Sequence, residues 1–187
     1  MLTGVDVTCG YAAVGVKFHP WGRRTNITVE RPMKTPIRTK NLRQEAPHSP
    51  RELLYGFAIA ARTVDKCRAS LAGTLGDFHY DCPLDNMLFA FKGINGDQFK
   101  EAVKKAAYYE DVGTWLQANG TPKTSVEIRN WSEQMIATNP FTNPERRAWF
   151  SEECGKLGLD PATTTLFDWL EADDRALSAP KKELAHT

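Results

Sequence analysis

The stretch HSPRELLYGFAIAARTVDKCRASLAG, residues 48–73, carries the strongest structural signal in the chain. Its apolar residues are spaced alternately by four and three positions, which is the period of an amphipathic helix. They are Leu53, Phe57, Ala60, Val64, Cys67 and Leu71. Ser49 is a good N-cap, Pro50 suits a first turn, and Gly73 stands where a C-terminal glycine is common. The pattern predicts one long helix that begins near Ser49.

Six further segments show helical spacing and are bounded by proline, glycine or capping residues. They cover residues 84–93, 97–109, 110–120, 124–138, 142–158 and 163–176. The connections are short, so neighbouring helices are expected to pack closely. We therefore predict an all-α fold, with about seven helices in a single compact domain over residues 47–177. Residues 1–46 are expected to form a flexible or loosely packed extension, and residues 178–187 a disordered tail.

Composition narrows the class of protein. The chain has 187 residues, 41% hydrophobic and 25% charged, which suits a globular domain. No apolar run approaches the length of a membrane span, and the start is a poor signal peptide, so we expect a cytoplasmic protein without a membrane partner. Residues 1–48 carry an excess of five positive charges, yet no nucleic-acid-binding motif accompanies them, so a nucleic-acid partner is disfavoured. Residues 11–30 could form a β-hairpin, but an isolated two-stranded hairpin is only marginally stable in water, so we do not favour it.

The four cysteines contain no CxxC pair, which disfavours a zinc knuckle. Cys67 and Cys154 are expected to be small core residues. Cys82 lies in the polar stretch GTLGDFHYDCPLDN, residues 73–86, together with His79, Asp81 and Asp85.

Two chemistries are considered for this stretch. His79 and Cys82 have a spacing that suits one metal ion, with Asp81 or Asp85 adding oxygen. Only His48 is a plausible further ligand, so no metal and no cofactor are predicted. Alternatively, Cys82 and His79 form a thiolate–imidazole pair, which the nearby aspartates would oppose. Packing of Cys82 at the base of the following helix is the favoured reading.

The helix before the stretch bears Arg62, Asp65, Lys66 and Arg68. In one reading Asp65 orients Arg62, whose guanidinium then binds a phosphate or carboxylate ligand. In the other interpretation, Arg62 forms an ion pair with an aspartate of residues 73–86. Both interpretations predict that residues 73–86 contact the helix. The acidic pair at 173–174 is expected to face water.

A family resemblance rests on three groups of residues: Arg62…Asp65-Lys66…Arg68-Ala69, Leu71-Ala72-Gly73 and Tyr80-Asp81-Cys82-Pro83-Leu84-Asp85. Together with WLEADDR, residues 169–175, these resemble the bacterial family called domain of unknown function 5069. The likeness spans roughly residues 36–175. It implies a small, soluble, mostly helical protein without an assigned activity and brings no catalytic residues. Residues 1–32 have no counterpart in the family pattern, so Met33 is expected to be the native start.

These observations predict a helical module that binds a small molecule or a protein in a charged cleft. The expected ligand-binding residues are Arg62, Asp65, Arg68, Tyr80 and Asp85. The alternative is a small enzyme that uses His79, Cys82 and Asp81, with or without a divalent metal.

Overall fold

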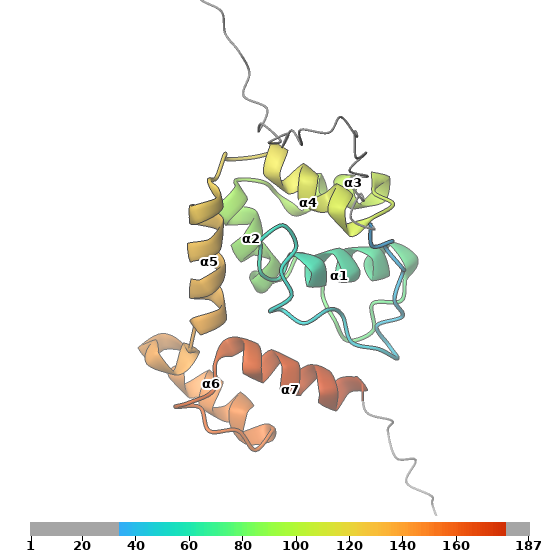
Figure 1. The fold of residues 1–187 in the computed structure, drawn as a ribbon. Helices are drawn as coiled ribbons and strands as arrows, with labels where there is room; N and C mark the ends of the chain where they lie inside the picture. Colours follow the sequence, from blue (N-terminus) through green and yellow to red (C-terminus); the bar gives the residue numbers. More distant parts are fainter. Residues whose placement is uncertain (1–33, 179–187) are drawn as a thin grey trace, which may run out of the picture. The chain divides into compact units, whose positions relative to one another are not determined.

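The computed structural model describes residues 34–178, which form seven α-helices and one 3-10 turn (Figure 1). The elements are α1 (Ala60–Ala72), α2 (Pro83–Lys92), α3 (Gly96–Lys105), α4 (Tyr109–Ala118), α5 (Ser125–Ala137), η1 (Pro140–Thr142), α6 (Pro144–Lys156) and α7 (Leu166–Ser178). The described residues contain two isolated β-bridges and no sheet. The all-α prediction is confirmed. Three predictions concern residues outside the described range: the hairpin over residues 11–30, the native start at Met33 and the tail over residues 179–187.

Helix α1 is the central element. It contacts α2, α3 and α4, and in Figure 1 it lies between the α3–α4 pair and α7. Every residue from Ala60 to Cys67 is buried, whereas an ordinary surface helix buries one stripe. Cys67 and Cys154 are both fully buried, as predicted. Arg62, Asp65 and Lys66 of α1 are therefore also inside the protein, where each must find a partner.

The predicted start of the first helix is wrong, because α1 begins at Ala60 rather than near Ser49. Leu54 and Phe57 exchange two backbone hydrogen bonds of 3.1 and 3.0 Å, which close a tight turn. The two central residues of this turn, Tyr55 and Gly56, have φ values of 53° and 86°. Such a pair of left-handed residues is typical of a hairpin turn and cannot continue a helix.

The turn changes which side chains reach the core. Phe57, Ala58 and Ile59 are fully buried in succession, whereas Leu53 is 52% exposed. Ile59 also has a φ of 59° as the N-cap of α1, a conformation that β-branched residues rarely adopt. Burial of three consecutive apolar residues thus outweighs the helical periodicity of residues 53–57.

Local capping signals have mixed outcomes. The sequence allows Thr124 or Ser125 as the cap of α5 and Thr142 or Asn143 as the cap of α6, and the structure has Thr124, in a capping box with Glu127, and Asn143. The predicted segment begins at Asp97, whereas Asn95 forms the capping box with Gln98 and α3 begins at Gly96. Residues within the predicted extension also make contacts: Leu42 is buried beside Ala69 and Phe78, and Ile37 N donates to Ala107 O (2.9 Å).

The connection between α4 and α5 is packed against the end of α2. Lys92 is fully buried and its Nζ donates to Thr121 O at 2.8 Å, while burial lowers the pKa of the Lys92 ammonium. Gly120 has a φ of 69°, and a Cβ atom there would lie 2.0 Å from Lys92 O. A glycine is therefore required at this position, and the entry to α5 is placed by backbone contact.

Candidate functional site

The polar residues of α1 contact several other segments of the chain. Arg62 donates from Nη2 to Asp174 Oδ1 at 2.8 Å and from Nη1 to the second carboxylate oxygen at 2.5 Å. The two side chains are only 4% and 7% exposed. The expectation that Asp174 faces water is wrong, because α7 turns it inward onto α1. Arg62 therefore forms its ion pair with Asp174, and not with Asp65 or with an aspartate of residues 73–86.

Asp65 has partners of its own. Its carboxylate accepts hydrogen bonds from His48 N (2.8 Å), His48 Nδ1 (2.7 Å) and the hydroxyl of Tyr109, and Lys40 Nζ lies 2.8 Å away. Burial alone would raise the pKa of this carboxyl, but the hydrogen bonds from His48, Lys40 and Tyr109 hold it below its usual range. Burial and the neighbouring carboxylate raise the pKa of Tyr109. Asp65 therefore joins α1 to α4 and to residues 40–48.

Lys66 and Asp85 form the third buried group. Lys66 Nζ lies 2.8 Å from Asp85 Oδ1, and the hydroxyl of Thr63 donates to the same carboxylate oxygen at 2.9 Å. Lys66 Nζ also donates to Cys82 Sγ at 3.2 Å. The other oxygen of Asp85 accepts from Asp81 N at 3.0 Å. The 80–85 segment therefore lies against α1, and its contacts run through Thr63 and Lys66.

The remaining residues singled out in the sequence lie near this segment. The Tyr80 hydroxyl donates to Gly96 O at 2.7 Å, and burial raises the pKa of Tyr80. Arg68 donates to Ala106 O at the end of α3. Asp81 is exposed with a φ of 60°, and His79 is also exposed.

The structure places the Cys82 thiol beside Lys66, a residue that was not among the candidate catalytic residues. The Cys82 thiol is joined by a hydrogen bond to Lys66, and no hydrogen bond between Cys82 and His79 is found within residues 34–178. In the same range, no three His, Cys, Asp or Glu side chains are grouped closely enough to hold a metal ion. Nor does any helix of this part of the chain have the length and apolar character needed to cross a membrane.

Sequence reasoning did not pair His48, Tyr109 and Asp174 with α1. Their separations from their α1 partners are 17, 44 and 112 residues. Helix periodicity relates residues three or four apart, so it carries no information at such distances. In APHSP, residues 46–50, Pro47 and Pro50 restrict the backbone next to His48, and this is the one local sign that His48 is held in place.

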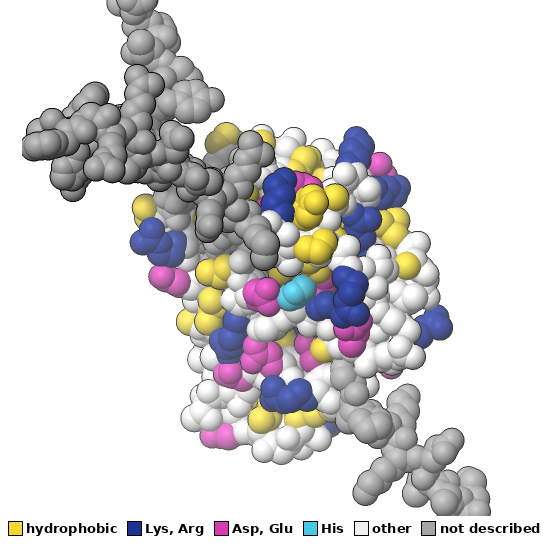
Figure 2. Space-filling model, turned by 45° about the vertical axis from the view of Figure 1, so that its right-hand side comes forward, with side chains coloured by type: hydrophobic (Ala, Val, Ile, Leu, Met, Phe, Trp, Pro, Cys, Tyr) yellow, Lys and Arg dark blue, Asp and Glu magenta, His cyan; other side chains and the backbone are white. Residues whose placement is uncertain are grey.

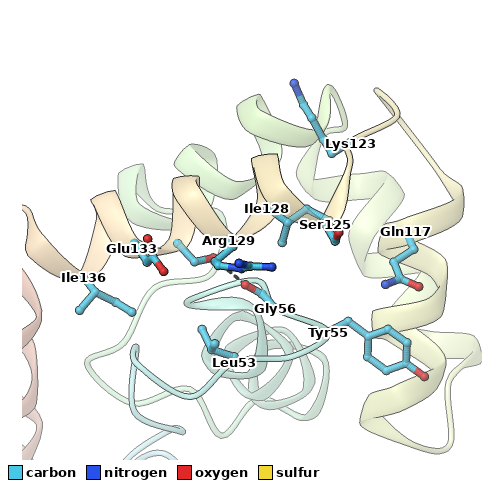
Figure 3. A pocket seen from close by; sticks show the side chains of 11 residues that line it. Leu53, Tyr55, Gly56, Gln117, Lys123, Ser125, Ile128, Arg129, Glu133 and Ile136 are labelled. Carbon is cyan, nitrogen blue, oxygen red and sulfur yellow. Dashed lines mark hydrogen bonds between the residues drawn. The ribbon is translucent and has the colours of Figure 1, made fainter.

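A groove of about 470 Å³ lies between the 54–57 turn and α5 (Figure 3). We call it the α5 groove. Its apolar lining includes Leu53, Ile128 and Ile136, and its size is typical of small-molecule sites. The turn is fastened to α5 by Ser132, whose hydroxyl accepts from Ala58 N at 2.9 Å and donates to Gly56 O at 2.7 Å.

Three charged residues line the α5 groove: the cations Lys123 and Arg129 and the anion Glu133. Lys123 stands at its upper end in Figure 3, and Arg129 extends along it over Gly56. Within the described residues, neither Arg129 nor Lys123 makes a salt bridge, although Lys123 Nζ lies 4.8 Å from the centre of the Phe91 ring. On the face of the molecule in Figure 2, by contrast, acidic and basic side chains are interspersed. The groove thus combines apolar walls with the carboxylate of Glu133 and with two cations that make no salt bridge to any described residue.

These features define an all-α domain organised around a buried, charged helix, with a separate apolar groove. The chain belongs to the family described as Domain of unknown function (DUF5069), which matches residues 44–176. The resemblance in the sequence is thereby confirmed. No curated protein matches the chain.

Proposed function

We propose that this domain binds a small amphipathic anion and that the α5 groove is its binding site. The observation that carries the proposal is the position of Arg129, a cation that makes no salt bridge within residues 34–178 and extends along an apolar groove of about 470 Å³. Ligand sites of this size are usually apolar with a few polar groups that orient the ligand. An apolar body would cover Leu53 and Ile136, and an anionic end would pair with Arg129 or Lys123.

The charged cleft between α1 and the 80–85 segment stays a second prediction for the binding site. Its charged groups already have protein partners: Lys66 pairs with Asp85, and Arg62 with Asp174. A ligand there would have to replace buried ion pairs, whereas Arg129 is available without such a loss. This difference favours the α5 groove. The enzyme that uses His79, Cys82 and Asp81 likewise stays a prediction.

A thermal-shift and calorimetric titration with three ten-carbon chains tests the proposal. Decanoate, decanol and decylamine share an apolar body and differ in charge, and each is used below its micelle-forming concentration. A ligand that binds the folded state raises the melting temperature by mass action. We expect decanoate to raise it most and decylamine least. Equal shifts with all three would contradict the proposed role of the cations.

Variants of the chain then place the site. Arg129→Gln is expected to weaken decanoate binding about fivefold, the equivalent of about 1 kcal/mol for an exposed ion pair. Arg146→Gln is the matched control, because Arg146 is an exposed arginine of α6 that does not line the groove. Leu53→Asp should abolish binding, since it places an anion among the groove's apolar residues. Unchanged binding by Leu53→Asp would show that decanoate binds elsewhere.

A further inference from the structure

We propose that Cys82 and Lys66 form an oxidation-dependent covalent site, in which a peroxide oxidises the thiol and the lysine amine then bonds to the sulfur. The proposal is independent of the α5 groove. It rests on the contact between Lys66 Nζ and Cys82 Sγ, which are 3.2 Å apart. Groups held this close react with a large effective concentration, so a reactive sulfur species formed here meets the amine before other nucleophiles.

The position of Cys82 exposes its sulfur to a small oxidant while keeping it in contact with Lys66. Cys82 is the N-cap of α2, and its side chain makes no capping hydrogen bond to that helix. Pro83 follows at the first helical position, where its fixed φ holds the start of the helix. Cys82 is a partly exposed residue, whereas the Lys66 side chain is only 4% exposed. A peroxide can therefore approach the sulfur from solvent while the amine lies on its protein side.

The other cysteines of the described part lack these features. Cys67 and Cys154 are fully buried, so a dissolved peroxide does not reach them. Burial raises the pKa of the Cys67 thiol to about 11, which keeps it in the unreactive protonated form. Within residues 34–178, Cys82 alone combines partial exposure with a hydrogen bond from a lysine.

The chemistry balances with one peroxide as the oxidant. In the first step the Cys82 sulfur attacks hydrogen peroxide, which breaks the O–O bond and leaves a sulfenic acid and water. In the second step the Lys66 amine attacks that sulfur, a nitrogen–sulfur bond forms, and the sulfenic oxygen leaves as a second water. The sulfur is oxidised by two electrons and the peroxide is reduced by two. Asp85, whose Oδ1 lies 2.8 Å from Nζ, accepts the proton that the ammonium must lose before it attacks.

The bond joins two segments that already touch. Thr63 and Lys66 on α1 both contact Asp85, which lies in the first turn of α2. The cross-link therefore ties α1 to the start of α2 along an existing contact, and the packing changes little. A dithiol reductant reverses it, returning the thiol and the amine as the reductant itself becomes a disulfide.

Peptide mapping of the full chain after treatment with hydrogen peroxide tests the proposal. We expect a cross-linked peptide pair that joins residues 66 and 82, with a mass lower by about 2 Da than the sum of the reduced peptides, as a sulfenamide requires. Dithiothreitol should abolish it. Cys82 found as a sulfinic acid or as a dimedone adduct, with Lys66 unmodified, would overturn the proposal. So would a bridge that retains the oxygen.

Three variants separate the chemistry from folding. Lys66→Arg keeps the positive charge beside Asp85 but offers a far weaker nucleophile, so the cross-link should disappear and a dimedone adduct at Cys82 should appear instead. Cys67→Ser is the control that keeps both reacting groups and should retain the cross-link. Should Lys66→Arg fail to fold, Cys82→Ser removes the sulfur with little change in size. A cross-link to Lys66 that persists in Cys82→Ser would overturn the assignment.

Discussion

Arg62 of α1 and Asp174 of α7 form a bidentate ion pair between two buried side chains that are 112 residues apart. The pair joins the last helix to the central one. The Arg62 guanidinium also lies 5.6 Å from the centre of the Phe78 ring. A buried charge without its partner is strongly destabilising, so each member of this pair depends on the other.

Replacement of Asp174 tests this dependence. Asp174→Ala should lower the free energy of unfolding by about 3–5 kcal/mol, because it leaves a buried guanidinium without its counterion. Asp173→Ala is the matched control. Burial and the neighbouring Asp174 raise the pKa of Asp173, so its charge is already unfavourable. Its removal should change the stability by less than about 0.5 kcal/mol or increase it. Urea denaturation measures both, and equal losses would contradict a special role for the pair.

The Asp65 carboxylate predicts how stability depends on pH. Its pKa is lower in the folded protein than its ordinary value, because hydrogen bonds from His48, Lys40 and Tyr109 outweigh the effect of burial. The unfolded state therefore binds the proton more readily, and the contribution of Asp65 is full above the unfolded pKa of about 4. It declines as the pH falls through the folded pKa.

Asp65→Asn isolates this contribution. The stability gap between wild type and variant, measured by urea denaturation, should be widest near neutral pH and should narrow below about pH 4. The narrowing begins because the unfolded state takes up a proton at Asp65, and it is complete once the folded carboxyl is also protonated and resembles the amide. A gap that stays constant from neutral pH down to acid unfolding would refute the role of the Asp65 charge.

Ser132 predicts a link between stability and the α5 groove. Ser132→Ala removes the acceptor of Ala58 N and the donor to Gly56 O, so it should cost about 1–3 kcal/mol. The loosened turn should also reduce the thermal shift produced by decanoate. Ser125→Ala is the control, because Ser125 lines the same groove but is exposed. If both serine variants behaved alike, the turn would not depend on Ser132.

Two glycines predict opposite effects of the same substitution. Gly120→Ala should destabilise the protein by about 2 kcal/mol or more, because its φ is 69° and the new Cβ would meet Lys92 O. Gly155 lies inside α6, and no atom of the described residues outside that helix's backbone lies within 4 Å of an added Cβ. Gly155→Ala should stabilise the helix by about 0.5–1 kcal/mol. Melting temperatures measured side by side check the opposite signs.

Helix number and most helix ends were accessible from the sequence because their signals are local. Thr124 and Asn143 cap their helices with side chains that reach two or three residues ahead, so the pattern and the contact lie in the same short stretch. The same local logic failed at residues 49–59. There the apolar spacing is helical, yet the Leu54–Phe57 turn buries Phe57, Ala58 and Ile59 together in the core.

The partners of the charged residues were decided by the tertiary structure. The charges of Arg62, Asp65 and Lys66 are evident in the sequence, but spacing along one helix cannot indicate that α7, α4 and the 80–85 segment converge on α1. The α5 groove is likewise formed by a turn and a helix that lie more than sixty residues apart. Secondary structure follows from interactions between near neighbours, whereas ion pairs and cavities depend on how distant segments pack.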